Sequence, residues 1–240
     1  TLVEELAVAD GEVVQKAVKV AAGLEPAASC LDAGRLARLP APPETGREGL
    51  RAVQRTLARA ANLAAAGQQA EAQAAAREAR SEAAAFGWPP LIAAADYWIG
   101  VSLAGSGAYE EGARALEDAY FAALEGEAIS VAADAARSLA RVLAVELARP
   151  VEARSWLRHA GVLVRELEAE PGLRSALVIV GRGIQHVGAG EYVEARGQYE
   201  RALEIREAIL GPDHPEVAAV LVNLGDTHWR RGEYAEAIEL

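Results

Sequence analysis

One hexapeptide decides the fold: it is Gly190–Ala195, which reads Gly-Glu-Tyr-Val-Glu-Ala. Counting this one, the pattern occurs five times with varying similarity, and the copies begin at Gly67, Gly107, Ala148, Gly190 and Gly232. The steps between these first residues are 40, 41, 42 and 42 residues. A fixed period in the range of roughly 20–50 residues is typical of a stacked repeat architecture. Such an array holds other molecules, so its function is a binding function unless catalytic residues are present.

The composition favours an all-α fold. The chain has 240 residues, of which 52% are hydrophobic but only 5% aromatic, and much of the apolar content is alanine. Alanine has the highest intrinsic helix propensity and lets neighbouring helices approach closely. No sustained alternation of apolar and polar residues indicates a strand.

Proline and glycine divide the chain into helix pairs. A glycine that can adopt a positive φ ends the first helix of four pairs. The third pair has Ala148-Arg149-Pro150 at this place, so we expect its turn to be built differently. The first helices of the pairs are predicted near 48–66, 89–105, 127–147, 172–188 and 214–230, and the second helices near 69–86, 109–125, 151–169, 192–210 and 233–240.

The pattern also predicts the domain organisation. Residues 1–22 read as an amphipathic helix, and proline and glycine cluster from there to Gly46 around a helical candidate at 31–39. We therefore expect an N-terminal segment over 1–46 and an array over 47–240. Its five units are 47–87, 88–126, 127–170, 171–211 and an incomplete 212–240.

Charge and hydropathy exclude several classes of partner. The net charge of −11 opposes binding to nucleic acid, which needs clustered cationic side chains. Arginines alternate with glutamates, as in Arg201 and Glu204, and this predicts a solvated helix face. No apolar stretch reaches the roughly 18 residues that span a membrane. The single cysteine, Cys30, excludes an internal disulfide and favours a cytoplasmic protein.

Catalytic and metal-binding motifs are absent from the sequence, which predicts that this segment is not an enzyme and needs no metal or cofactor. Protein kinase motifs do not occur. His186 and His228 stand 42 residues apart at one repeat position, which favours packing over metal ligation. His214 is expected to help cap the helix that follows it, and Asp213 and Glu216 have the spacing of a capping box.

The second, fourth and fifth units carry the motif of a known family. Leu224-Gly225, then Gly232 and Tyr234, resemble the tetratricopeptide repeat, in which Leu-Gly, an aromatic residue and alanine recur at fixed offsets. The period near 42 and the linker Gly211–Pro215 resemble the kinesin-light-chain type of this repeat. The resemblance implies a right-handed α–α superhelix of antiparallel helix pairs. It places small residues where the two helices of a pair cross: these are Gly100, Gly183, Gly225, Ala195 and Ala237.

Two residues depart from the family pattern. Arg141 stands where the third unit should have glycine, so we expect its helices to cross at wider separation. Asp96 occupies an apolar position of the second unit. Either the helix is rotated so that Tyr97 or Trp98 fills the position, or Asp96 bonds to a neighbouring helix; the cost of an unpaired buried carboxylate favours rotation.

The first 50 residues resemble the connector of bacterial serine/threonine protein kinases that carry such repeats, known mainly from myxobacteria. Leu6–Val18 followed by Ala22-Gly23-Leu24 carries this resemblance. It implies a regulatory, partner-binding C-terminal region of a kinase. The alternative is a sensor or oligomerisation arm of a signalling ATPase or transcription regulator. The absence of methionine indicates a segment of a longer protein, and the scarcity of lysine beside arginine favours a bacterial source.

The resemblance also implies a concave groove lined by the first helix of each unit. The groove positions are mostly apolar and lack the basic pairs that capture peptide carboxylates, so an apolar or mixed protein segment is the expected partner. The alternative is an empty groove that serves as a spacer. The apolar face of the last unit predicts either further repeats or self-association. The groove residues are Gln54, Leu57, Ala61, Tyr97, Val101, Ser138, Val142, Val180, Ile184, Val222, Asn223 and Asp226.

Overall fold

The computed structural model describes residues 42–43, 46–168 and 170–240 of the chain. The helix predicted over 1–22 and the helical candidate at 31–39 lie outside the described residues. From Arg47 onward the regular elements that the structure describes are all helices.

The helices follow the predicted ranges to within two residues at every end, if the first helix of the third pair is taken with the π-helix that continues it. Proline occupies the first turn of α6, α9 and α12, where its missing N–H costs nothing because that group has no partner inside the helix. In the described residues the elements are α4 (Arg47–Ala65), α5 (Gln69–Phe86), α6 (Pro89–Gly105), α7 (Tyr109–Glu125), α8 (Ile129–Arg141), the π-helix η2 (Val142–Glu146), α9 (Pro150–Leu167), α10 (Leu173–Gly188), α11 (Tyr192–Leu210), α12 (Pro215–Arg231) and α13 (Tyr234–Glu239).

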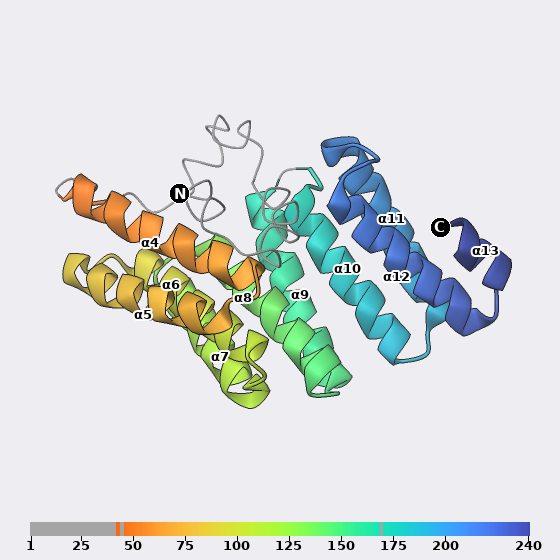
Figure 1. The fold of residues 1–240 in the computed structure, drawn as a ribbon, viewed down its shortest axis with the longest axis horizontal. Helices are drawn as coiled ribbons and strands as arrows, with labels where there is room; N and C mark the ends of the chain where they lie inside the picture. Colours follow the sequence, from red (N-terminus) through yellow and green to blue (C-terminus); the bar gives the residue numbers. More distant parts are fainter. Residues whose placement is uncertain (1–41, 44–45, 169) are drawn as a thin grey trace. The chain divides into compact units, whose positions relative to one another are not determined.

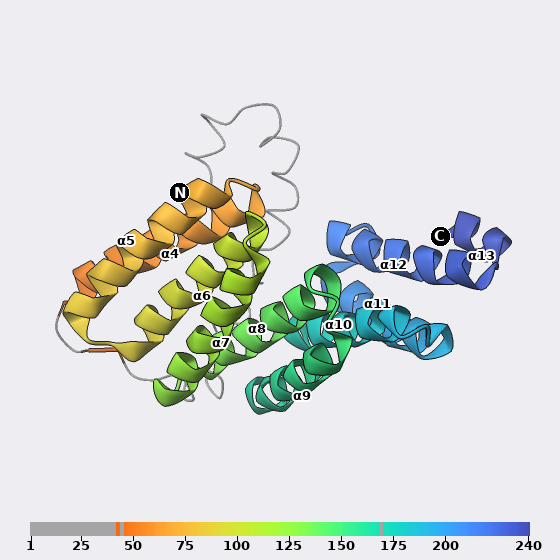
Figure 2. The same ribbon diagram turned by 90° about the horizontal axis from the view of Figure 1, so that it is seen from below.

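The described residues divide into two compact units, one ending at Leu139 and the other spanning Ala140–Leu240. In the first unit α4 packs on α5, α5 on α6 and α6 on α7 (Figure 1). In the second unit α9 packs on α10, α10 on α11, α11 on α12 and α12 on α13 (Figure 2). Helices α4 to α7 and α9 to α12 thus bury apolar residues against neighbours in sequence, as a stacked array requires, whereas α13 has no buried residue.

The cores of both units are thin because small side chains fill them. Alanines such as Ala79 and Ala83 are fully buried between α4, α5 and α6. In the second unit Tyr199 is the largest fully buried side chain, and it lies among alanine, leucine and valine from α10, α11 and α12. Burial raises the pKa of Tyr199, and the nearby carboxylate of Asp226 raises it further.

Glycine permits the close crossing of two helix pairs. A Cβ on Gly183 would lie 2.4 Å from the ring of Tyr199, and one on Gly100 would lie 2.9 Å from Cγ of Leu116. Both predicted crossing positions are therefore confirmed. Gly225 is different, since its Cβ would meet nothing nearer than the carbonyl oxygen of Ala237 at 3.6 Å. This last pair does not need a glycine for space.

The turns inside the pairs use a residue with positive φ, as predicted. Gly190 has a φ of 75° and Gly232 one of 80°, values that side chains with a Cβ seldom adopt. The following N–H closes each turn on the carbonyl five residues earlier: Glu191 donates to His186 at 2.9 Å and Glu233 to His228 at 3.0 Å.

The third pair does have a different turn. The first helix ends in the π-helix η2, and the non-glycine residue Ala148 takes the positive φ, at 52°. Here the N–H of Arg149 donates to the carbonyl of Leu143, six residues earlier, at 2.7 Å. A π-helix adds one residue to a helical turn. Because of this extra residue, the residues before the turn are shifted by one position relative to the repeat register of the other pairs.

This shift corrects the expectation for Arg141. Its side chain is exposed and pairs with Glu146 at 3.0 Å, so it does not separate the helices. Ala140 lies eight residues before Ala148 and is 1% exposed, whereas Gly183 lies seven residues before Gly190. Ala140 is therefore the equivalent of the crossing glycine, and the assignment of this position to Arg141 was wrong by one residue.

Asp96 takes the second of its two predicted arrangements. Its carboxylate accepts a hydrogen bond from Nε of Arg80 on α5, at 2.5 Å. The neighbouring Trp98 packs on the apolar clusters of the first unit. An ion pair with the preceding helix pair thus satisfies Asp96.

The start of α12 is capped by a histidine. Nδ1 of His214 accepts the N–H of Glu216 at 3.1 Å, so its predicted capping role is confirmed. The capping box of Asp213 and Glu216 was wrong, because Asp213 lies one residue before the cap. The carboxylate of Glu216 instead pairs with Arg206, a side chain of α11 that is only 5% exposed.

Candidate functional site

The first unit brings two of its predicted groove residues together. The hydroxyls of Tyr97 on α6 and Ser138 on α8 lie 3.3 Å apart, although 41 residues separate them in sequence. Tyr97 and Val101 are half-buried. Ser138 is 7% exposed, so a partner would meet Tyr97 rather than Ser138. Of the further candidates, Leu57 is buried and Gln54 is exposed.

In the second unit the predicted groove residues differ widely in exposure. Val222 is 71% exposed, while Val180 and Ile184 pack against the core cluster around Tyr199. Asp226 is exposed and accepts a hydrogen bond from Nε of Arg230 at 2.7 Å, one turn along the same helix. Asn223 is half-buried beside Val222.

Val142 is no part of an accessible surface, because it is fully buried. It belongs to the π-helix, whose extra residue changes the face that this position presents. Projecting the family register across this turn therefore gave the wrong position for Val142. The remaining groove residues keep at least partial exposure, apart from Ser138 and Leu57.

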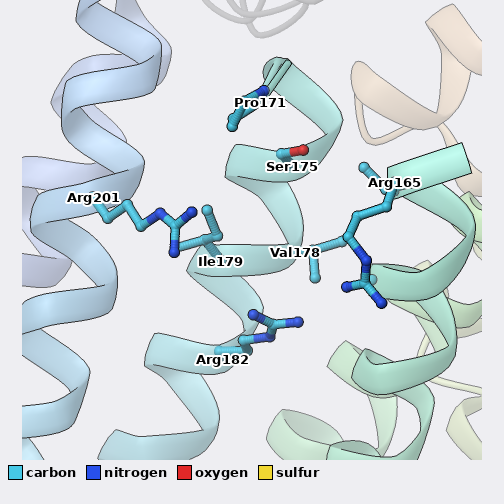
Figure 3. Close-up of a pocket in the computed structure, with 9 residues that line it drawn as sticks. Arg165, Pro171, Ser175, Val178, Ile179, Arg182 and Arg201 are labelled. Carbon is cyan, nitrogen blue, oxygen red and sulfur yellow. The ribbon is translucent and has the colours of Figure 1, made fainter. Parts of the chain in front are cut away.

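A pocket of about 160 Å³ lies within the second unit and was not predicted from the sequence. Three helices contribute to it, and Figure 3 shows the guanidinium of Arg182 between Arg201 on one side and Arg165 on the other. Arg165 comes from α9, Arg182 from α10 and Arg201 from α11. The apolar lining consists of Val164, Pro171, Val178 and Ile179, with Gly161 and Ser175 completing the wall.

Gly161 makes room for the arginines. A Cβ at this position would lie 2.8 Å from Nη2 of Arg182 and 3.9 Å from Nη1 of Arg165. The two guanidinium groups thus approach the same point on α9. Any larger residue than glycine at this position would displace the Arg182 side chain.

The three arginines raise the positive potential in this pocket. Burial lowers the pKa of Arg182, and the positive charges of Arg165 and Arg201 lower it further. Among the described residues, none of the three forms an ion pair with a carboxylate. Arg201 and Glu204 are both exposed, as predicted for a solvated helix face, and no ion pair joins them.

A carboxylate near the pocket, that of Glu168, is bonded to the end of a helix. It caps the N-terminus of α10 by accepting the N–H groups of Gly172 at 3.0 Å and of Ser175 and Arg174 at 3.2 Å each. The hydroxyl of Ser175 also donates to it, at 2.6 Å. Glu168 lowers the positive charge near the pocket, but its oxygens are bound to the helix end rather than to the arginines.

The two repeat-related histidines form matching pairs across their turns. Nδ1–H of His186 donates to Glu191 at 2.6 Å, and Nδ1–H of His228 donates to Glu233 at 2.7 Å. These pairs stabilise the turns, in agreement with a structural role.

Searches for other kinds of site within the described residues gave two results. No group of three or more His, Cys, Asp or Glu side chains in that part could hold a metal ion. No helix there is both long and apolar enough to cross a membrane.

With this geometry established, the chain can be compared with known proteins. Residues 174–240 match the tetratricopeptide repeat family. This stretch covers nearly all of α10 and the three helices after it. It therefore contains the fourth and fifth helix pairs, in which a His–Glu contact accompanies the glycine turn. No curated protein matches the chain by sequence.

Solved tetratricopeptide repeat structures share the fold. The crystal structure of BtubC (BKLC) from P. vanneervenii has a TM-score of 0.67 at 19% identity, over 96% of this chain and 88% of that chain. The nearly identical TPR-like repeats of a putative kinesin light chain from Podosopora anserina have a TM-score of 0.58 at 18% identity, over 78% of this chain and 90% of that one. A second crystal structure of the same repeats gives a TM-score of 0.59, with the same identity and coverage.

These likenesses establish the fold class. The chain is an all-α solenoid of antiparallel helix pairs, as the sequence predicted, and the comparison with kinesin-light-chain repeats is confirmed at the level of the fold. At such low identity they carry no information on partners.

Proposed function

We propose that the chain is a non-catalytic scaffold for protein–protein interaction. The observation that carries this proposal is the stack of consecutive helix pairs together with the tetratricopeptide repeat match over 174–240. A stack of such pairs presents side chains from successive helices at a regular spacing, which suits a helical or extended protein segment. We also propose that the array spans 47–240 in the five units given above.

The proposed contact surface lies on the first helices of the pairs. In the compact unit that ends at Leu139, this surface consists of Tyr97 and Val101. In the compact unit Ala140–Leu240, it consists of Val180, Ile184, Val222, Asn223 and Asp226. Val222 supports this assignment, because an aliphatic side chain 71% exposed beside polar Asn223 offers a mixed apolar and polar contact.

Site-specific photo-crosslinking tests this surface. A photoreactive residue replaces Val222 in one variant and Val151 in the matched control. Val151 is 79% exposed and lies at the start of α9, a second helix of its pair. We expect a discrete crosslinked protein from the Val222 position and none from Val151. Equal crosslinking from both positions, or none from either, would contradict the proposed surface.

We further propose a cytoplasmic location and a place in the regulatory region of a bacterial serine/threonine protein kinase. The support is the resemblance of Leu6–Val18 and Ala22–Leu24 to the connector of such kinases. The coding sequence upstream of Thr1 tests this directly. Kinase motifs there would support the proposal, whereas a P-loop would favour the signalling ATPase. Incubation of this chain with ATP and a protein substrate should give no phosphotransfer.

A further inference from the structure

The arginine pocket of the second unit has more positive charge than the structure neutralises. Arg165, Arg182 and Arg201 line one cavity of about 160 Å³, and among the described residues no carboxylate pairs with any of them. Arg182 is half-buried, so water screens its charge less than that of an exposed residue. Like charges in such proximity destabilise the folded protein unless an anion binds between them.

This cluster stands out because the rest of the chain is acidic. The net charge is −11, and most arginines for which a contact is described have an acidic partner, such as Arg80 with Asp96 and Arg206 with Glu216. A nucleic acid strand that lies along much of the protein surface would be repelled by that overall charge. A small anionic group that enters one pocket would be attracted by the local field.

The pocket favours a phosphoryl group over a carboxylate. Three guanidinium groups offer more N–H donors than the two oxygens of a carboxylate can accept. A phosphate monoester has three terminal oxygens and a charge of about −1.5 to −2 at pH 7, and arginine binds it with paired hydrogen bonds. The apolar lining of Val164, Val178, Ile179 and Pro171 can contact the part of the ligand that carries the phosphate.

We propose that this pocket binds the phosphoryl group of a phosphorylated side chain on a partner protein. This rests on the proposed role as an interaction scaffold, and it names the chemistry by which one partner is selected. The pocket involves α9, α10 and α11, and none of the predicted groove residues lines it.

Calorimetric titration of the whole chain with phenyl phosphate tests the proposal. The test variant is Arg182→Gln, and the control is Arg114→Gln, which removes the same charge from an exposed position on α7. We expect the affinity to fall roughly tenfold or more in Arg182→Gln and to stay unchanged in Arg114→Gln, since hydrogen bonds between charged groups contribute most to such binding. Equal affinities in the two variants would overturn the proposal.

A second variant pair tests the shape of the pocket without removing charge. Gly161→Ala places a methyl group against Arg182 and should weaken phenyl phosphate binding severalfold. Gly197→Ala on α11 adds the same group where no atom lies within 4 Å and should have no effect. If Arg182→Gln does not fold, as judged by circular dichroism, Arg201→Gln at an exposed position replaces it.

Other ligands separate the alternatives. If benzoate binds with the same affinity as phenyl phosphate, the pocket is a carboxylate site. If adenosine monophosphate binds with higher affinity than phenyl phosphate, the pocket is a nucleotide site. Either result would overturn the proposal. Crosslinking through Val222 does not depend on the pocket. A failure to bind phenyl phosphate with crosslinking retained would therefore refute this inference alone, and a loss of crosslinking alone would refute the proposed contact surface.

Discussion

The third and fourth helix pairs reach the same architecture through different turns. The fourth pair turns at Gly190 in a regular α-helical register, with Gly183 at the helix crossing. The third pair contains a π-helix, turns at Ala148 and has Ala140 at the equivalent crossing position. The comparison shows that the array tolerates one extra residue in a turn if the helix before it widens locally.

The two pairs also differ in how the turn is held. In the fourth pair the side chains of His186 and Glu191 bond across it, and the fifth pair repeats this contact with His228 and Glu233. In the third pair the corresponding backbone bond joins Leu143 and Arg149, whose side chains cannot form such a pair. Arg149 bonds instead to Glu152 at the start of α9, at 2.7 Å.

The largest effect is expected from exchanging the two crossing residues. Gly183→Ala places a methyl group 2.4 Å from the buried ring of Tyr199, and overpacking of this kind should lower the free energy of unfolding by about 2 kcal/mol. Ala140→Gly should lower it by a similar amount, about 2 kcal/mol, because it removes a buried methyl group and reduces helix propensity. Urea denaturation followed by circular dichroism measures both changes.

Gly197→Ala is the control for this exchange. It lies on α11 with open space around it, so the substitution should leave stability unchanged or raise it by up to about 1 kcal/mol through helix propensity. A stable Gly183→Ala protein would mean that the helices of the fourth pair can move apart without cost.

A smaller effect, of opposite sign in the two pairs, is expected at the turns. Ala148→Gly should raise the free energy of unfolding by about 0.5–1 kcal/mol, because glycine adopts the positive φ of 52° without strain. Gly190→Ala should lower it by about 1 kcal/mol for the same reason. If Ala148→Gly destabilised the protein, the methyl group of Ala148 would itself stabilise the third turn, and the positive φ would not be the dominant cost.

The smallest effect is expected from the His–Glu pairs. Double-mutant cycles with alanine should give a coupling of about 0.5 kcal/mol for His186 and Glu191. The coupling of His228 and Glu233 should be somewhat larger, because their side chains are 14% and 29% exposed, compared with 24% and 44% in the fourth pair. Cycles repeated in about 1 M salt should give smaller values. Zero coupling at low salt would show that the backbone alone holds these turns.

The sequence by itself determined the helices, their order and most of their turns. These depend on local properties: proline at helix starts, glycine at positive φ and an apolar period that repeats every 40 to 42 residues. The resemblance to the tetratricopeptide repeat also implied close helix crossings at Gly100 and Gly183, where an added Cβ would overlap the facing side chain.

Only the tertiary structure decided which side chains meet across helices. The π-helix exchanged the roles of Ala140 and Arg141, and it buried Val142, which the repeat register had placed on the surface. Arg80 with Asp96, Arg206 with Glu216 and the three arginines of the pocket come from different helices. Their contacts depend on the rotation and spacing of packed helices, and a shift of one residue turns a side chain by about 100° around the helix axis. A local sequence pattern does not determine that rotation. The packing of the helices therefore decided which arginine side chains line the pocket.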